Sequence, residues 1–258
     1  MNARLRSTIS KIAPRAATLV LVILIWQLIC SVGQVPKYML PSPGDVVSAF
    51  QKDWLLMLDH AQVTLTETFL GLFFGILIGF FMAVVMDRFS IIRKMVYPLV
   101  ILSQTIPTVA IAPLLVIWLG YQMLPKIILI VLVVAFPITI SLLEGFSSVE
   151  PDTIRLMRSM GASRIQIFRF VKLPNSLSYF FSSLKISVSY AVVSAVVSEW
   201  IGGTKGLGCY MTRVRKSFSS DKMFAVIILV SVISLLLIWL TTVLQRVCMP
   251  WEKFNRKE

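Results

Sequence analysis

"SMGASRIQIFRFVKLP", residues 159–174, is a basic and partly polar run with helical spacing in a chain that is otherwise very apolar. The 258 residues are 57% hydrophobic and only 14% charged, whereas soluble domains carry roughly 25% charged residues. This composition indicates an integral membrane protein. A basic, partly polar segment is costly to bury in lipid, so residues 159–174 are expected outside the bilayer, and their role there bears on the fold.

The chain has a formal net charge of +13, which suggests an anionic partner. The basic residues sit between long apolar runs and not along one polar face, so the pattern favours membrane phospholipid over nucleic acid. Cys30, Cys209 and Cys248 are far apart, and His60 is the single histidine of the sequence. We therefore expect no metal site, no disulfide framework and no catalytic residues.

Six segments are apolar enough to cross a bilayer core as helices, which takes about 20 residues. They run near residues 17–32, 64–86, 96–119, 127–143, 184–200 and 223–247. The first follows a basic N-terminus, as a signal peptide would, but the residues after it make a poor cleavage site. We expect a retained first span and an all-α membrane protein with a single domain over residues 1–258.

The distribution of lysine and arginine over the connecting segments predicts the orientation. Alternate connections carry 16 such residues on one side of the membrane and 8 on the other. Because basic residues accumulate on the cytoplasmic side, both termini and the connection at about 144–175 are expected in the cytoplasm. The connection at about 201–222 is then external, although it is itself basic.

Two spans carry small or polar residues at helical spacing. Gly71, Gly75 and Gly79 predict a smooth groove on the second span where a neighbouring backbone approaches closely. On the fifth span, polar side chains fall within about 80° of arc on one helix face. This stripe consists of Ser183, Ser187, Tyr190, Ser194 and Ser198. Helix packing is the favoured interpretation of the stripe, and a substrate-lining face is the alternative.

The third span contains Pro107 and Pro113, which remove two intrahelical hydrogen-bond donors. Proline at membrane depth is tolerated where water or polar groups complete the backbone, so we expect a bent or interrupted helix beside a cavity. Four polar residues cluster at this break, namely Ser103, Gln104, Thr105 and Thr108. A kink that serves packing alone is the alternative.

The opening stretch belongs to a pair of short helices, residues 151–174, which we call the elbow. Pro151 suits a first helical position and Gly161 a position just past a helix end, so one helix is predicted over 151–160. Ser163 and Gln166 form a capping-box pattern that starts a second helix, with Pro174 as its limit. By itself the elbow predicts either an amphipathic hairpin on the inner leaflet or a docking site for a cytoplasmic protein.

The order Gly161, nine residues, Val171, one residue, Leu173 and Pro174 resembles the cytoplasmic "EAA" loop of ABC importer inner-membrane permeases. Three further stretches are similar to the sulfonate, taurine, nitrate and thiamine-precursor branch of that family. They are "LPSP" at 40–43, "PTVAIAPLLVIWLG" at 107–120 and "EWIGGTKGLG" at 199–208. "LMRSMGASRIQIFRFVKLP" and "GYQMLPK" at 120–126 look most similar to members grouped with uptake of the thiamine pyrimidine precursor.

The resemblance implies a type I importer permease fold with six spans and a coupling helix between spans four and five, which docks on an ATPase subunit. The residues implied in coupling are Arg155, Met157, Ser159, Met160, Gly161, Ala162, Ser163, Leu173 and Pro174. The chain departs from the pattern in one place, because Arg155, Leu156 and Met157 stand where the family has Glu-Ala-Ala. Glu150, Asp152 or an acid on the partner would then replace the missing glutamate.

The resemblance also implies the partners. They are a pair of ATPase subunits, which use ATP and Mg, a second copy of the permease, and an extracytoplasmic solute-binding protein in a bacterial inner membrane. The chain has no P-loop, so it binds no cofactor of its own. The pathway residues expected are Ser103, Gln104, Thr105, Thr108, Ser187, Tyr190, Ser194 and Ser198.

Two other classes of protein fit the sequence less well. An ion-driven carrier usually has an ionisable residue in mid-span, and none lies between Leu70 and Val85 or between Ala225 and Gln245. A membrane enzyme needs clustered nucleophiles, metal ligands or paired acids. The importer permease, with a thiamine pyrimidine precursor or else a sulfonate, taurine or nitrate as solute, is therefore the favoured prediction.

Overall fold

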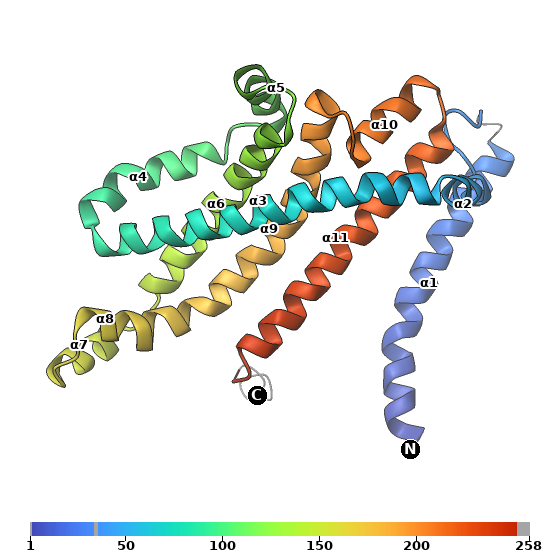
Figure 1. The fold of residues 1–258 in the computed structure, drawn as a ribbon. Helices are drawn as coiled ribbons and strands as arrows, with labels where there is room; N and C mark the ends of the chain where they lie inside the picture. Colours follow the sequence, from blue (N-terminus) through green and yellow to red (C-terminus); the bar gives the residue numbers. More distant parts are fainter. Residues whose placement is uncertain (1, 34–35, 252–258) are drawn as a thin grey trace. The chain divides into compact units, whose positions relative to one another are not determined.

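The computed structural model describes residues 2–33 and 36–251, and every regular element in those ranges is a helix (Figure 1). The basic residues Lys253, Arg256 and Lys257, used above for orientation, lie outside the described residues. Contacts divide the chain into two compact units, one of residues 1–58 with 210–229 and one of residues 59–209 with 230–258.

The first unit contains α1 (Asn2–Val32), α2 (Pro43–Lys52), most of α10 (Leu207–Lys216) and the start of α11 (Ser220–Cys248). The indole of Trp26 donates to the Pro41 carbonyl at 3.0 Å and its ring lies 5.7 Å from that of Phe224. Ser42 and Asp45 form a capping box at the start of α2. These contacts tie the end of α1 to the helices that follow.

The second unit is built on α3 (Trp54–Arg88), α6 (Met123–Ser147) and α9 (Leu173–Gly202), which are labelled in Figure 1. Their buried apolar side chains form one core. The glycine groove predicted on α3 is confirmed. A Cβ added at Gly75 would lie 2.7 Å from a methyl of Val134, and one at Gly79 would lie 2.6 Å from the Ala135 carbonyl. The missing side chains therefore let α6 pack directly against the backbone of α3.

The predicted interruption of the third span is also confirmed. Two helices, α4 (Ser90–Ser103) and α5 (Thr108–Leu119), meet at an angle of 102° across residues 104–107. Pro107 precedes the first residue of α5, whereas Pro113 lies inside α5 without ending it. The break therefore coincides with Pro107. Pro113 does not interrupt α5, which tolerates the missing N–H donor of that residue.

Four helices of the described chain are long and apolar enough to cross a membrane, or five if α4 and α5 count as one broken span. The four are α3, α6, α11 and the run Arg164–Gly202. In α1 the apolar segment is Val20–Val32, which is shorter than the length needed. The structure thus shows an all-helical protein with four to five apolar spans.

The prediction that Pro174 ends the second elbow helix is wrong. After α7 (Pro151–Ser159), the helix α8 (Arg164–Ile167) continues through a π-helical turn, η1 (Phe168–Lys172), directly into α9. The Leu173 N–H bonds to the Phe168 carbonyl, five residues back. The wider π turn brings Pro174 into the first turn of α9, where its missing N–H is tolerated.

Candidate functional site

The break between α4 and α5 opens onto a cavity of about 610 Å³. Its lining comes from the break with the adjoining ends of α4 and α5, and from α6 and α9. The polar residues are Ser103, Gln104, Thr108, Tyr190 and Ser194. Five of the eight residues predicted for the pathway therefore line one cavity, and none of its lining residues is charged.

The other three predicted pathway residues lie elsewhere. Thr105 is exposed and donates to the Leu102 carbonyl at 2.7 Å. Ser198 is buried and donates to the Ala195 carbonyl at 2.7 Å. Ser187 is fully buried, and its hydroxyl has no hydrogen-bond partner among the described residues. The serine stripe is thus divided, with one part packed inside the helix bundle and Ser194 at the cavity.

The elbow has the geometry that its sequence predicts up to Lys172. Gly161 has a φ of +77°, in the left-handed region that favours glycine. Its N–H donates to the Arg158 carbonyl at 2.9 Å, and the Ala162 N–H donates to the Met157 carbonyl at 3.0 Å, as in a Schellman motif. Ser163 and Gln166 form the predicted capping box. The turn between α7 and α8 is therefore tightly specified by local residues.

Two large apolar side chains of the elbow are exposed. Met160 is 75% exposed and Ile165 is 77% exposed, on either side of Gly161. Arg155, which replaces the glutamate of the family pattern, forms an exposed 3.1 Å ion pair with Asp152. Seven of the nine predicted coupling residues lie on or between α7 and α8, whereas Leu173 and Pro174 lie beyond η1, at the start of α9.

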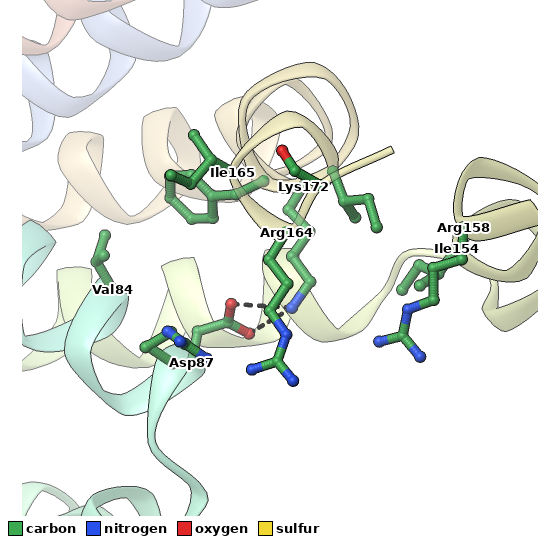
Figure 2. A pocket seen from close by; sticks show the side chains of 11 residues that line it. Val84, Asp87, Ile154, Arg158, Arg164, Ile165 and Lys172 are labelled. Carbon is green, nitrogen blue, oxygen red and sulfur yellow. Dashed lines mark hydrogen bonds and ion pairs between the residues drawn. The ribbon is translucent and has the colours of Figure 1, made fainter. Parts of the chain in front are cut away.

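A second cavity, of about 740 Å³, lies between the end of α3 and the elbow (Figure 2). Asp87 and Lys172 form an ion pair across it, with distances of 2.7 and 2.9 Å from the ammonium to the two carboxylate oxygens. Phe168 of η1 packs edge-on against Phe146 of α6 at 5.3 Å between ring centroids. These contacts hold the elbow against α3 and α6.

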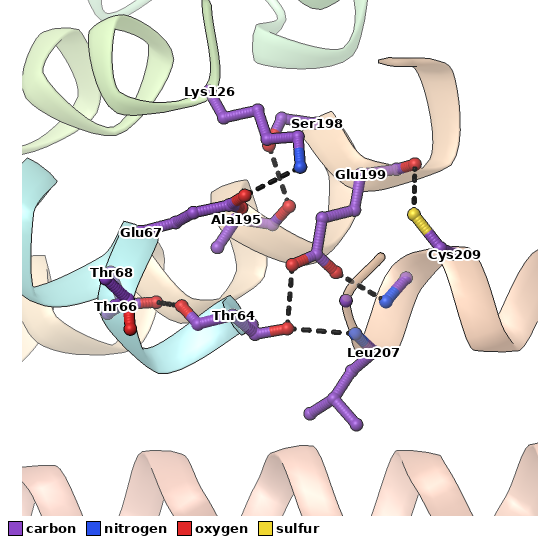
Figure 3. A network of polar contacts seen from close by, with 12 residues as sticks. Thr64, Thr66, Glu67, Thr68, Lys126, Ala195, Ser198, Glu199, Leu207 and Cys209 are labelled. Atoms are coloured by element: carbon purple, nitrogen blue, oxygen red, sulfur yellow. Dashed lines mark hydrogen bonds and ion pairs between the residues drawn. The ribbon is translucent and has the colours of Figure 1, made fainter. Parts of the chain in front are cut away.

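Sequence reasoning missed a buried polar network where α3, α6, α9 and the start of α10 meet (Figure 3). Lys126 and Glu67 form a 2.6 Å ion pair, with side chains that are 6% and 1% exposed. One Glu199 oxygen accepts from the Thr64 hydroxyl at 2.7 Å and the other from the Gly208 N–H at 2.6 Å. Buried charges require such partners.

The same network explains the "EWIGGTKGLG" stretch. The N–H of Leu207 donates to the Thr64 hydroxyl at 2.9 Å and that of Gly206 to the His60 ring at 3.0 Å. Gly206 has a φ of +128°, which L side chains rarely adopt, and its backbone lies against the Glu199 carboxylate. Glu199 therefore anchors the connection between α9 and α10. Two acidic residues near span ends, Glu67 and Glu199, were the features of the sequence from which this network could have been predicted.

A family model described as "Binding-protein-dependent transport system inner membrane component" matches residues 75–247. The chain belongs to this family. It is accordingly a multi-pass inner-membrane permease of an ABC transporter, a transport subunit rather than an enzyme. The predicted resemblance is confirmed.

Three relatives cover most of this permease. A "Probable ABC transporter permease protein" of Haemophilus influenzae is 37% identical, over 83% of this chain and 88% of its own length. The "Formylaminopyrimidine transport permease protein ThiX" of Halalkalibacterium halodurans is 33% identical, over 90% of this chain and 93% of its own length. The "Taurine transport system permease protein TauC" of Escherichia coli is 30% identical, over 91% of this chain and 88% of its own length.

The fold has solved counterparts. A chain of the MetNI methionine ABC transporter in an inward-facing conformation matches with a TM-score of 0.68 at 20% identity, over 75% of this permease and 96% of that chain. A chain of a bacterial ABC transporter involved in alginate import matches with a TM-score of 0.64, over 94% of this permease and 98% of that chain. The helical arrangement is thus that of ABC transporter permeases.

Proposed function

We propose that this permease forms half of the translocation pathway of an ATP-driven importer for a small, uncharged polar solute. The observation that carries the proposal is the cavity at the break between α4 and α5. Interrupted helices line solute sites in other transporters because they expose backbone polar groups at membrane depth. Here the break presents an amide and two hydroxyls, from Gln104, Ser103 and Thr108.

The chemistry of the cavity favours a thiamine pyrimidine precursor as solute. A sulfonate or nitrate ion held away from water needs a positive partner such as arginine, and the cavity lining contains no charged side chain. A neutral heterocycle needs hydroxyl and amide groups together with an aromatic or apolar wall. Tyr190, Gln104 and Phe136 offer these groups. Transport of taurine, an aliphatic sulfonate or nitrate by the same assembly is the alternative.

The elbow is the proposed coupling helix, docked on a separate ATPase subunit that uses ATP and Mg. Support comes from its exposed apolar residues Met160 and Ile165 and from the rigid turn at Gly161. A large apolar side chain in a basic segment gains by burial in a protein groove. The proposed assembly has six spans per permease, two permeases, two ATPases and an external solute-binding protein, with both termini of the permease in the cytoplasm.

Uptake into sealed proteoliposomes tests the proposal. Vesicles that contain the permease and its ATPase should take up a formylaminopyrimidine when ATP and the binding protein are supplied, and unlabelled taurine should not compete. Competition by taurine would instead select the sulfonate alternative. ATP-independent uptake by the permease alone, under an ion gradient, would support a secondary carrier and contradict the importer.

Co-purification tests the elbow separately. Met160→Asp and Ile165→Asp place charges on exposed positions, so the fold should persist while the ATPase is lost during purification. Phe218→Asp is the matched control, because Phe218 is also 77% exposed but lies between α10 and α11. Retention of the ATPase by both elbow variants would exclude docking at this surface.

A further inference from the structure

The cavity between the end of α3 and the elbow has an excess of positive charge that the permease itself does not neutralise. Asp87 is the one acidic residue among its lining residues, and Lys172 already pairs with it. Three guanidinium groups remain, from Arg88, Arg158 and Arg164. None of the three has an ion-pair partner in the described part of the chain.

The arginines come from three different elements and converge on the same cavity. Arg88 is the last residue of α3, Arg158 lies in the last turn of α7, and Arg164 is the first residue of α8. Figure 2 shows Arg164 beside the Asp87–Lys172 contact, with Arg158 farther away next to Ile154. Arginine offers several N–H donors in a fixed plane, a geometry that matches phosphate oxygens.

Apart from Ser163, the rest of the cavity lining is apolar. Val84 on α3, Ile154 on α7 and Phe168 on η1 line it. Beside it, the surface of α3 continues with exposed aromatic residues, including Phe81 at 67%. A free phosphate ion would contact the arginines alone, whereas an amphiphile with a phosphate group would contact both the arginines and the apolar wall.

We propose that this cavity binds the headgroup phosphate of an anionic phospholipid, with an acyl chain along the exposed apolar surface of α3 that includes Phe81. Ile165 of the proposed ATPase surface also lines this cavity, whereas Met160, the most exposed large hydrophobic residue of α7 and its cap, does not. Bound lipid bridges α3 to α7 and α8, and so holds the elbow at a fixed distance from the membrane-embedded helices.

Native mass spectrometry of the purified permease tests the site, with phosphatidylglycerol and phosphatidylcholine as probes and the ATPase absent. Phosphatidylglycerol should remain bound after detergent removal, and phosphatidylcholine should not. The double variant Arg158→Gln, Arg164→Gln should weaken phosphatidylglycerol binding by about tenfold or more, because each charge-assisted contact to phosphate is strong.

The matched control is Arg169→Gln, since Arg169 lies in the adjacent η1 and stacks on the Phe170 ring instead of lining the cavity. Arg158→Lys with Arg164→Lys should retain part of the binding, because the charge remains and only the fork geometry is lost. Equal binding by the Gln double variant and the control, or equal retention of both lipids, would overturn the proposal. Displacement of the lipid by millimolar inorganic phosphate would assign the site to a soluble anion. Because no step requires transport or ATPase binding, the outcome is independent of the proposed function.

Discussion

At the scale of single residues, Glu199 is the most consequential side chain outside the cavity. It is 1% exposed and accepts hydrogen bonds from Thr64 on α3 and from the Gly208 N–H at the start of α10. Each carboxylate oxygen therefore holds a different segment of the chain. The loss of one such bond leaves a buried donor unsatisfied, which costs more than the bond itself contributes.

Glu199→Gln should destabilise the permease by about 1–3 kcal/mol, because the amide can accept one of these bonds but turns an N–H₂ group toward the other donor. Thermal unfolding in detergent measures the change, and proteolysis at Lys205 reports the freed connection. Glu144→Gln is the control, since Glu144 is an exposed residue of α6. Equal stability of the two variants would show that the network has no energetic role.

Asp53, between α2 and α3, predicts a dependence of stability on pH. Its carboxylate accepts hydrogen bonds from Lys222 at 2.7 Å and Tyr210 at 2.5 Å, which hold the pKa of Asp53 below its ordinary value of 3.8. A pKa lowered by folding contributes stability above the pKa of the unfolded chain, and this stability is lost as the pH falls through the folded pKa. The permease should therefore unfold more easily below about pH 4.

The variant Asp53→Asn should be less stable than the parent at about pH 6 and should lose much of this difference at about pH 3. Unfolding temperatures at the two pH values measure it. A constant difference between parent and variant would contradict the assignment. Burial, together with the negative charge of Asp53, raises the pKa of Tyr210, so the tyrosine remains protonated throughout this range and does not contribute to the change.

At the scale of elements, the contact between α3 and α6 depends on the absence of side chains. Gly75→Ala should cost about 1–3 kcal/mol, because the new Cβ would collide with Val134 and the two helices must separate. Gly44→Ala is the matched control, since its new Cβ would meet only the Ser42 hydroxyl at 3.8 Å, and it should be neutral or slightly stabilising. Thermal unfolding distinguishes them, and equal values would contradict the close contact.

The elements also show which features local sequence can predict. Gly161, the Ser163–Gln166 capping box and the glycine spacing of α3 act over a few residues, so their patterns predicted the structure. Pro174 was misinterpreted because a π turn stabilised by packing against α6 accommodates it, and proline spacing alone carries no signal for such a turn. Glu199 and Thr64 are 135 positions apart, so their contact follows from the packing of α3 and α9 and from no local pattern.

At the scale of the whole molecule, the position of the cavity makes a prediction about transport. Gln104→Trp should fill the cavity and abolish uptake in the proteoliposome assay while the protein still binds its ATPase. Thr105→Trp is an adjacent control, because Thr105 is exposed at the same break but does not line the cavity. Loss of uptake in both variants would show that transport depends on the conformation of the break and not on the open cavity. Normal uptake in both variants would exclude the cavity as the pathway.

Residues 164–202 form 39 consecutive helical residues from the elbow to the Glu199 anchor, with a length of about 58 Å at 1.5 Å per residue. A bilayer core is about 30 Å thick, so this helical run is long enough to cross it and to extend beyond it. Under the coupling proposed above, a displacement applied near Arg164 would pass through the π turn at 168–172 and then along α9. The π turn at 168–172 is the one departure from α-helical geometry in residues 164–202, and a change in that turn would alter how much of the displacement reaches Glu199.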